Sequence, residues 1–189
     1  MEFSKIMKIQ DGLAILDLGG QPAIWDGVAE KLDITILNLP GIAHEAYATH
    51  HNIEYIEGDA CNIEGLGGRR FDIIFSNSVI EHVGDASYRG DFAREVRRLG
   101  SAYWIQTPSK FFPIEAHNGM PFWWFYPPAL RGFLIERWRE KLPDWTRMVE
   151  GTDIVTKAEL QGLFPEASIQ VERFFGLPKS YIAFWHPVD

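Results

Sequence analysis

The chain has 189 residues, of which 46% are hydrophobic and 23% are charged, a composition typical of a globular domain in water. We therefore expect a single domain over residues 1–189 with a short N-terminal extension. The formal net charge of −8 argues against nucleic acid as a partner, because an acidic protein repels a polyanion. No apolar run is long enough to span a bilayer, so we expect no stable membrane insertion.

The cysteine content and the N-terminal residues indicate the cellular compartment in which the protein is expected. The single cysteine, Cys61, excludes an intrachain disulfide. The N-terminal stretch MEFSKIMKIQDG lacks the apolar segment of a secretory signal. These features favour the cytoplasm. No group of histidines, cysteines and acids has the spacing of a metal site, so no metal is expected from the sequence.

Short apolar runs alternate with helical patterns along the chain. The strands expected from the apolar runs are, in chain order, residues 14–18, 34–39, 53–56, 71–75, 102–106, 168–175 and 180–185. The helices expected from apolar spacing are one within residues 1–10, then 22–32, 43–49, one containing Phe92, Val96 and Leu99, then 129–142 and 157–163. Residues 109–128 are rich in aromatics and prolines and indicate a loop.

This order predicts an α/β fold with a doubly wound, mostly parallel sheet. The last two strands are separated only by residues 176–179, which predicts a C-terminal antiparallel hairpin and seven strands in all. Ligands bind such sheets at the carboxyl ends of the strands, where the strand order reverses. The functional residues are therefore expected just after each of the first five strands.

Small and polar residues follow these strands. Gly19 and Gly20 end the first strand, where a glycine turn lets the backbone approach a ligand closely. Asn38 follows the second strand, at the place where an acid would accept hydrogen bonds from ribose hydroxyls. Asp59 follows the third strand, and residues 76–78 follow the fourth. Together these strand ends predict a nucleotide-like ligand.

The strand ends resemble those of class I S-adenosylmethionine-dependent methyltransferases, in particular the small-molecule, type 11/12-like group. The resemblance is carried by the runs ILDLG at residues 15–19, GDA at 58–60, FDIIFSNSVIEHV at 71–83, EVRRL at 95–99 and YWIQTP at 103–108. It extends from about residue 14 to the end of the chain. It rests on the order and spacing of all the motifs, since no single one is specific.

The resemblance implies a Rossmann-like methyltransferase fold and S-adenosylmethionine as cofactor. The implied cofactor-binding residues are Asp17, Gly19, Gly20, Asn38, Leu39, Asp59, Ala60, Ser76 and Asn77. The family has a three-glycine turn after the first strand, whereas here Gln21 and Ala23 stand at the second and third glycine positions. Asn38 also replaces the usual acid. Both differences are predicted to lower cofactor affinity.

The acceptor is expected above the carboxyl ends of the later strands. Methyl transfer from a sulfonium is an in-line displacement, and a hydroxyl acceptor also needs proton removal, for which His and Glu side chains are suited. We expect His117, Glu115 or His82 to lie nearest a small-molecule acceptor. In the alternative interpretation, His82 packs beside the cofactor, and Glu115 and His117 form an ion pair within a loop.

The aromatic run at residues 122–126 either lines an acceptor pocket, belongs to the core or forms a subunit contact, so a homodimer is left open. Two further functions are also open. One is a catalytically weak or inactive binding domain that acts as the partner of an active subunit. The other is a nicotinamide oxidoreductase, against which the terminal hairpin and the fourth-strand motif count. The acceptor, the methylated atom (O, N or C) and the pathway do not follow from the sequence.

Overall fold

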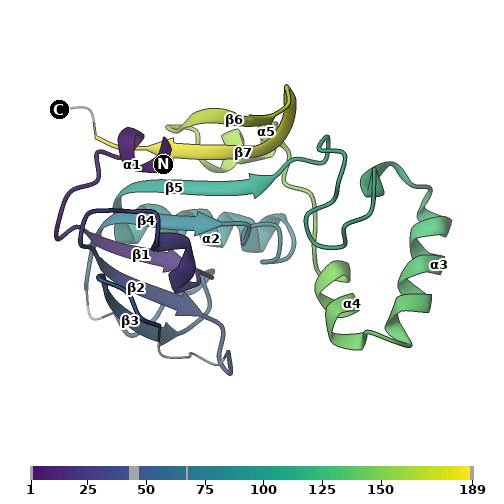
Figure 1. Ribbon diagram of the computed structural model, residues 1–189, viewed down its shortest axis with the longest axis horizontal. Coiled ribbons are helices and arrows are strands. Elements are labelled where there is room, and N and C mark those ends of the chain that lie inside the picture. The colour runs from purple at the N-terminus through teal and green to yellow at the C-terminus, as the bar shows by residue number, and fades with distance from the viewer. Residues whose placement is uncertain (1, 43–46, 67, 188–189) are drawn as a thin grey trace.

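The computed structural model describes residues 2–42, 47–66 and 68–187, and its centre is a seven-stranded sheet (Figure 1). The strand order is β3-β2-β1-β4-β5-β7-β6. The strands are β1 (Ala14–Leu18), β2 (Asp33–Asn38), β3 (Asn52–Glu57), β4 (Phe71–Asn77), β5 (Gly100–Pro108), β6 (Ser168–Phe174) and β7 (Leu177–Trp185). β1 to β5 pair in parallel, and β7 pairs antiparallel with both β5 and β6. The predicted fold class and hairpin are therefore confirmed.

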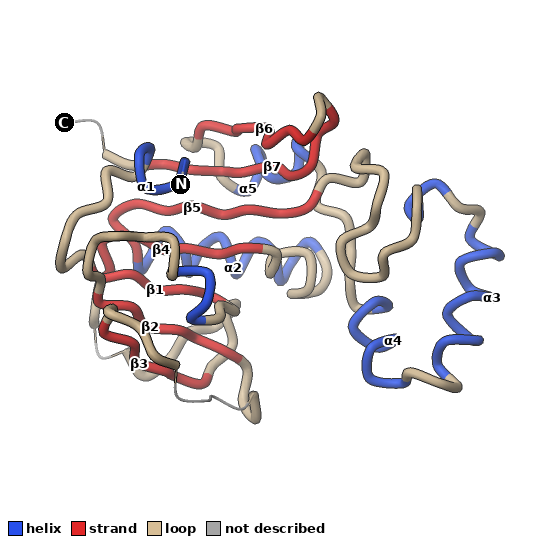
Figure 2. The backbone as a smooth tube through the Cα atoms, viewed as in Figure 1, coloured by secondary structure: helices blue, strands red, loops and turns tan. Residues whose placement is uncertain are grey.

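Two helices cover one face of the sheet, and two others project away from it (Figure 2). The helices are α1 (Glu2–Ile6), α2 (Ala86–Leu99), α3 (Pro128–Arg139), α4 (Pro143–Glu150) and α5 (Lys157–Leu163). α2 begins at Ala86 because the Asp85 carboxylate accepts hydrogen bonds from the next two free backbone N–H groups. The sequence did not predict α4. No helix in the described part of the chain is long and apolar enough to cross a membrane.

The helix predicted over residues 22–32 is wrong. The structure has a single 3₁₀ turn, η1 (Pro22–Trp25), followed by turns that lead into β2. The Trp25 indole N–H donates to Asp17 Oδ2 at 2.8 Å, and Val28 and Leu32 are buried beneath the turns. The apolar residues in this segment therefore reflect the burial of Trp25, Val28 and Leu32 against the sheet and not a helix. The helix predicted over 43–49 falls partly outside the described residues, and residues 47–49 are not helical.

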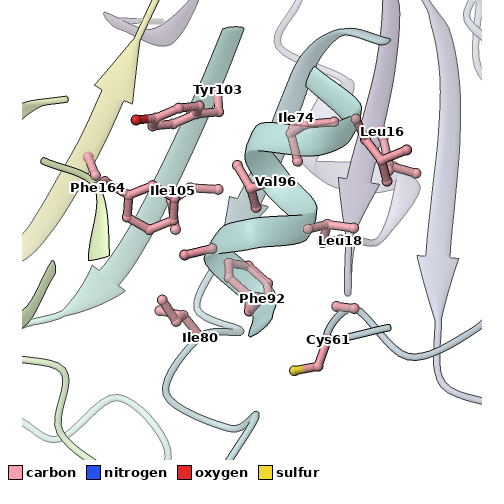
Figure 3. Packing of buried hydrophobic residues seen from close by; sticks show 14 of the residues in the cluster. Leu16, Leu18, Cys61, Ile74, Ile80, Phe92, Val96, Tyr103, Ile105 and Phe164 are labelled. Atoms are coloured by element: carbon pink, nitrogen blue, oxygen red, sulfur yellow. The ribbon is translucent and has the colours of Figure 1, made fainter. Parts of the chain in front are cut away.

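Two apolar clusters pack against the two faces of the sheet. Figure 3 shows the first, in which Phe92 and Val96 of α2 pack with Ile105 of β5 and with Phe164, which follows α5. The second lies under α1, where the Phe3 ring makes edge-to-face contacts with Trp25, Phe75 and Trp104. Because both faces are covered, the carboxyl ends of the central strands are held in fixed register.

Asp17 is the one acid buried inside the central strands, and it makes stability depend on pH. Burial raises the pKa of Asp17 to about 7, although the hydrogen bond from Trp25 opposes this rise. As pH rises from about 4 to 7, the unfolded chain loses this proton before the folded chain does. This group therefore stabilises the fold fully at low pH, and that stabilisation is lost as pH rises through 7.

We therefore predict that Asp17→Asn gains stability relative to the unaltered chain between pH 4 and 7, at up to about 1.4 kcal/mol per pH unit. Urea unfolding at several pH values measures the difference. Asp144→Asn changes a carboxylate that is 91% exposed and serves as the control, with no such trend. A constant difference for Asp17→Asn across this range would contradict the prediction.

Candidate functional site

The carboxyl ends of β1, β4 and β5 lie side by side at one edge of the sheet. In the strand register, Leu18 pairs with Ser76, and Asn77 pairs with Gln106. The Ser78 N–H then donates to the Gln106 carbonyl at 3.0 Å, and Ser78 adopts φ 60°, so the chain turns sharply after β4. The expected cofactor and acceptor residues are thus brought to one edge.

The glycine turn after β1 has no room for side chains. Gly19 has φ 71°, and a Cβ there would lie 2.5 Å from a Val79 methyl group. A Cβ on Gly20 would lie 1.9 Å from Asp17 Oδ2, well inside van der Waals contact. The turn therefore requires glycine at both positions, as expected where a ligand approaches backbone closely.

Three buried side-chain oxygens at this edge have no hydrogen-bond partner in the part of the chain that the structure describes. They are Asp17 Oδ1, Ser76 Oγ and Asn77 Oδ1, at the ends of β1 and β4. Buried polar atoms are nearly always paired in folded proteins, so an unpaired group marks a place where a ligand or water completes the set. Oxygens of this kind fit a ligand that donates hydrogen bonds, such as the ammonium group of an amino acid.

Of the predicted cofactor-binding residues after β2 and β3, Asn38 and Asp59 already make hydrogen bonds within the protein. The Asn38 side-chain amide donates to the Gly20 carbonyl at 3.2 Å, which leaves its amide oxygen for a ligand. Asp59 Oδ1 accepts from the Cys61 N–H at 2.8 Å and so braces the turn. Leu39 is exposed and Ala60 is buried. The cofactor-contacting roles of these four residues stay predictions.

A cavity of about 320 Å³ opens beyond the ends of β4 and β5. Ser78 and Gln106 form its floor next to the glycine turn, and the 109–124 segment supplies much of its wall. Its lining includes the aromatics Phe112, Trp123 and Trp124, the acids Glu81, Glu115 and Asp153, the cations Lys110 and Lys179, and also His117 and Thr152. Of the aromatic run at residues 122–126, Trp123 and Trp124 face the cavity, whereas Phe122 and Phe125 are exposed elsewhere.

The three predicted catalytic residues contact one another, and Glu115 and His117 of the three line this cavity. His117 Nδ1 lies 2.8 Å from Glu115 Oε1, and the Nε2 atoms of His82 and His117 lie 2.9 Å apart. Sequence reasoning missed Glu81, whose Oε1 lies 3.8 Å from His117 Nε2. Its only signal was the position next to His82 at the end of the fourth-strand motif. We call Glu81, His82, Glu115 and His117 the histidine–glutamate cluster.

The charges in this cluster follow from burial and pairing. Burial raises the pKa of Glu81 to about 7, and burial followed by the nearby His117 lowers the pKa of His82 to about 4. The hydrogen bond to Glu115 raises the pKa of His117. Burial would raise the pKa of Glu115, but hydrogen bonds from His117 and from backbone N–H groups outweigh it and lower the value. Glu115 is thus the carboxylate that holds its charge most firmly.

Comparison with known proteins gives a family-model match over part of the chain and a shared fold. Residues 33–101 match the family model described as a methyltransferase domain. No curated protein matches. Similar solved structures include the magnesium protoporphyrin IX methyltransferase of Synechocystis PCC 6803 with bound S-adenosylhomocysteine (TM-score 0.55, 10% identity, 97% of this chain and 78% of that chain).

Two further structures show the same fold. A SAM-dependent methyltransferase from Aquifex aeolicus has a TM-score of 0.54 at 14% identity over 97% of this chain and 86% of its own. A structure from Rhodobacter sphaeroides, described as a putative Zn-dependent alcohol dehydrogenase, has a TM-score of 0.60 at 11% identity over 95% and 86%. The chain thus shares its fold with these structures, and residues 33–101 are similar to a methyltransferase domain.

The glycine turn yields a direct test of the cofactor site. We predict that Gly20→Ala lowers affinity for S-adenosylhomocysteine at least about tenfold and lowers the melting temperature, because its Cβ displaces the Asp17 carboxylate. Gly90→Ala, in α2 with no atom within 4 Å of the new Cβ, is the matched control and leaves affinity unchanged. Calorimetry measures affinity, and unaltered binding by Gly20→Ala would place the ligand elsewhere.

Proposed function

We propose that this protein transfers a methyl group from S-adenosylmethionine to a small molecule bound in the cavity beyond β4 and β5. The observation that carries the proposal is the adjacency of two features. Unpaired buried oxygens lie at the ends of β1 and β4, beside the glycine turn, and the lining of a cavity of about 320 Å³ includes Ser78 and Gln106, at the ends of β4 and β5. A donor and an acceptor bound at these two places would be neighbours.

The residues at the sheet edge fall into two groups, one for each end of the cofactor. Asp17, Ser76 and Asn77 would hold its amino-acid end, beside the backbone of Gly19 and Gly20. Asn38, Leu39, Asp59 and Ala60 would hold the ribose and adenine end. When bound there, S-adenosylmethionine supplies an electrophilic methyl group on a sulfonium. The chain's own contribution is to fix this end of the cofactor against backbone and to exclude water from Asp17 and Ser76, which are buried.

The cavity favours a small acceptor with both apolar and polar parts. Its volume suits a compact molecule, and Phe112, Trp123 and Trp124 provide flat apolar surfaces. Glu81, Glu115 and His117 of the histidine–glutamate cluster also line the cavity and would accept a hydrogen bond from the acceptor's hydroxyl or amine. Holding the acceptor atom in line with the methyl carbon accounts for much of the acceleration in reactions of this type.

One observation favours a second function, that of an inactive binding domain. The helix expected after the glycine turn is a single 3₁₀ turn, so the N–H groups of a full first helical turn are missing beside Gln21. A domain with this change would keep the fold and cavity but bind the cofactor weakly. In that case a partner subunit would supply the activity.

Cofactor binding and single-turnover transfer separate the two functions. We expect S-adenosylmethionine and S-adenosylhomocysteine to bind in a one-to-one ratio by calorimetry. With methyl-labelled S-adenosylmethionine in excess, an acceptor screen of small phenols, amines and carboxylic acids should then yield a labelled product. Absence of binding at millimolar cofactor would exclude the proposed activity, whereas binding without any transfer would support the inactive domain.

Obstruction of the cavity tests where the acceptor binds. Ala116 is exposed on the cavity wall, so Ala116→Trp should fill space without disturbing the core. We expect it to raise the acceptor KM by about tenfold or more and to leave S-adenosylhomocysteine affinity unchanged. Ala158→Trp, on the exposed side of α5, is the control and should change neither. An unchanged KM for Ala116→Trp would move the acceptor out of this cavity.

A further inference from the structure

The hydrogen bonds of His117 fix which ring nitrogen carries its proton. His117 Nδ1 lies 2.8 Å from Glu115 Oε1, while Glu115 Oε2 accepts the N–H groups of His117 and Asn118 at 2.8 and 2.7 Å. Glu115 therefore acts as an acceptor only, and His117 donates through Nδ1. In the neutral ring, the lone pair then lies on Nε2, which faces His82.

His82 is fixed in the same way. Its Nδ1 lies 3.3 Å from Thr152 Oγ1, and that hydroxyl already donates its single hydrogen to the Met148 carbonyl at 2.9 Å. Thr152 can therefore only accept from His82, so the His82 proton is on Nδ1. The lone pair of His82 Nε2 points at the lone pair of His117 Nε2 across 2.9 Å. Two lone pairs at this distance repel unless a cation lies between them.

Glu81 adds a third donor atom to the same point. Its side chain is 2% exposed, its Oε2 accepts from the Thr107 hydroxyl at 3.1 Å, and its Oε1 has no hydrogen-bond partner among the described residues. That unpaired oxygen lies 3.8 Å from His117 Nε2. A shared proton would satisfy the two imidazoles but would leave Glu81 Oε1 unpaired in the interior. A metal ion would accept lone pairs from all three groups.

We propose that Glu81, His82 and His117 bind a divalent transition-metal ion, with Zn²⁺ the best fit. The three ligand atoms all lie within 4.8 Å of one another. Metal–ligand bonds of roughly 2.0–2.2 Å in a tetrahedral site separate neighbouring ligand atoms by roughly 3.3 Å. The present separations of 2.9 and 3.8 Å lie on either side of that value, so small side-chain rotations suffice.

The surroundings match those of a metal site with an open position. Glu115 and Thr152 hold the outer nitrogens of the two imidazoles, as carboxylates and hydroxyls do around metal-binding histidines. Two imidazoles and a carboxylate suit Zn²⁺, Co²⁺ or Fe²⁺ and disfavour Mg²⁺. Because Glu81, His117 and Thr152 line the cavity, the fourth position faces the acceptor. If the proposed methyl transfer holds, an acceptor oxygen bound there would become more acidic and more nucleophilic.

Metal titration of the intact chain tests the site without any methyl transfer. Protein stripped with a chelator is titrated with ZnCl₂ against a chromophoric competitor, and with CoCl₂ by visible absorption. We expect one Zn²⁺ per chain, a tetrahedral Co²⁺ spectrum and no competition from millimolar Mg²⁺. His117→Ala and Glu81→Gln should bind Zn²⁺ at least about 100-fold more weakly, while His186→Ala, outside the cluster, should bind like the unaltered chain.

Two milder variants guard against loss of folding. Glu115→Gln and Thr152→Val keep all three ligands but loosen the imidazoles, and should weaken Zn²⁺ binding by about 10- to 100-fold while the chain still unfolds cooperatively on heating. The proposal is overturned if the unaltered chain binds no Zn²⁺ below about 10 µM, or if His117→Ala binds as tightly as it does. S-adenosylhomocysteine binding, measured in parallel, reports on the proposed function separately. Transfer that persists in chelator would leave that function intact but remove the ion's role in it.

Discussion

The hydrogen bond between the Trp25 indole and the buried Asp17 carboxylate shapes the edge of the sheet at which the candidate site lies. It holds the chain after β1 in a single 3₁₀ turn and draws Trp25 beneath α1 against Phe75. The same carboxylate packs directly against Gly20, so the glycine turn cannot shift inward. The short passage into β2 and the position of the glycine turn both depend on this one contact.

β4 connects the two halves of the candidate site. Its last residues, Ser76 and Asn77, carry side-chain oxygens with no hydrogen-bond partner among the described residues, and Ser76 pairs with Leu18, which precedes the glycine turn. The left-handed turn at Ser78 then redirects the chain, and Glu81, which lines the cavity, follows three residues later, next to His82. A single strand thus serves the cofactor end and the acceptor end, which is why the two proposed ligands would lie next to each other.

The sequence predicted the strands well because buried parallel strands are continuous apolar runs bounded by glycine, proline and polar residues. It predicted the helix after β1 wrongly, since Ile24, Val28 and Leu32 have helical spacing although tertiary contacts with Asp17 decide the local conformation. The grouping of His82, Glu115 and His117 was predicted in part from their place after strand ends. The sequence did not single out Glu81, because a histidine next to it is the more usual catalytic residue. Only the fold shows that the Glu81 side chain is buried and lines the cavity.

The cluster is held from outside by the buried guanidinium of Arg89 in α2. Arg89 donates to the Gly84 carbonyl, and it pairs with Asp153 at 3.1 Å and Glu159 at 2.7 Å. The Asp153 N–H in turn donates to the Glu81 carbonyl at 2.8 Å. These contacts fasten the segment after α4 to the end of β4, and that segment carries Thr152 to His82. The two projecting helices α3 and α4 therefore matter to the site through the chain that returns from them. Because Thr152 and Asp153 of this returning segment line the cavity, a ligand that contacts them also affects the position of α3 and α4.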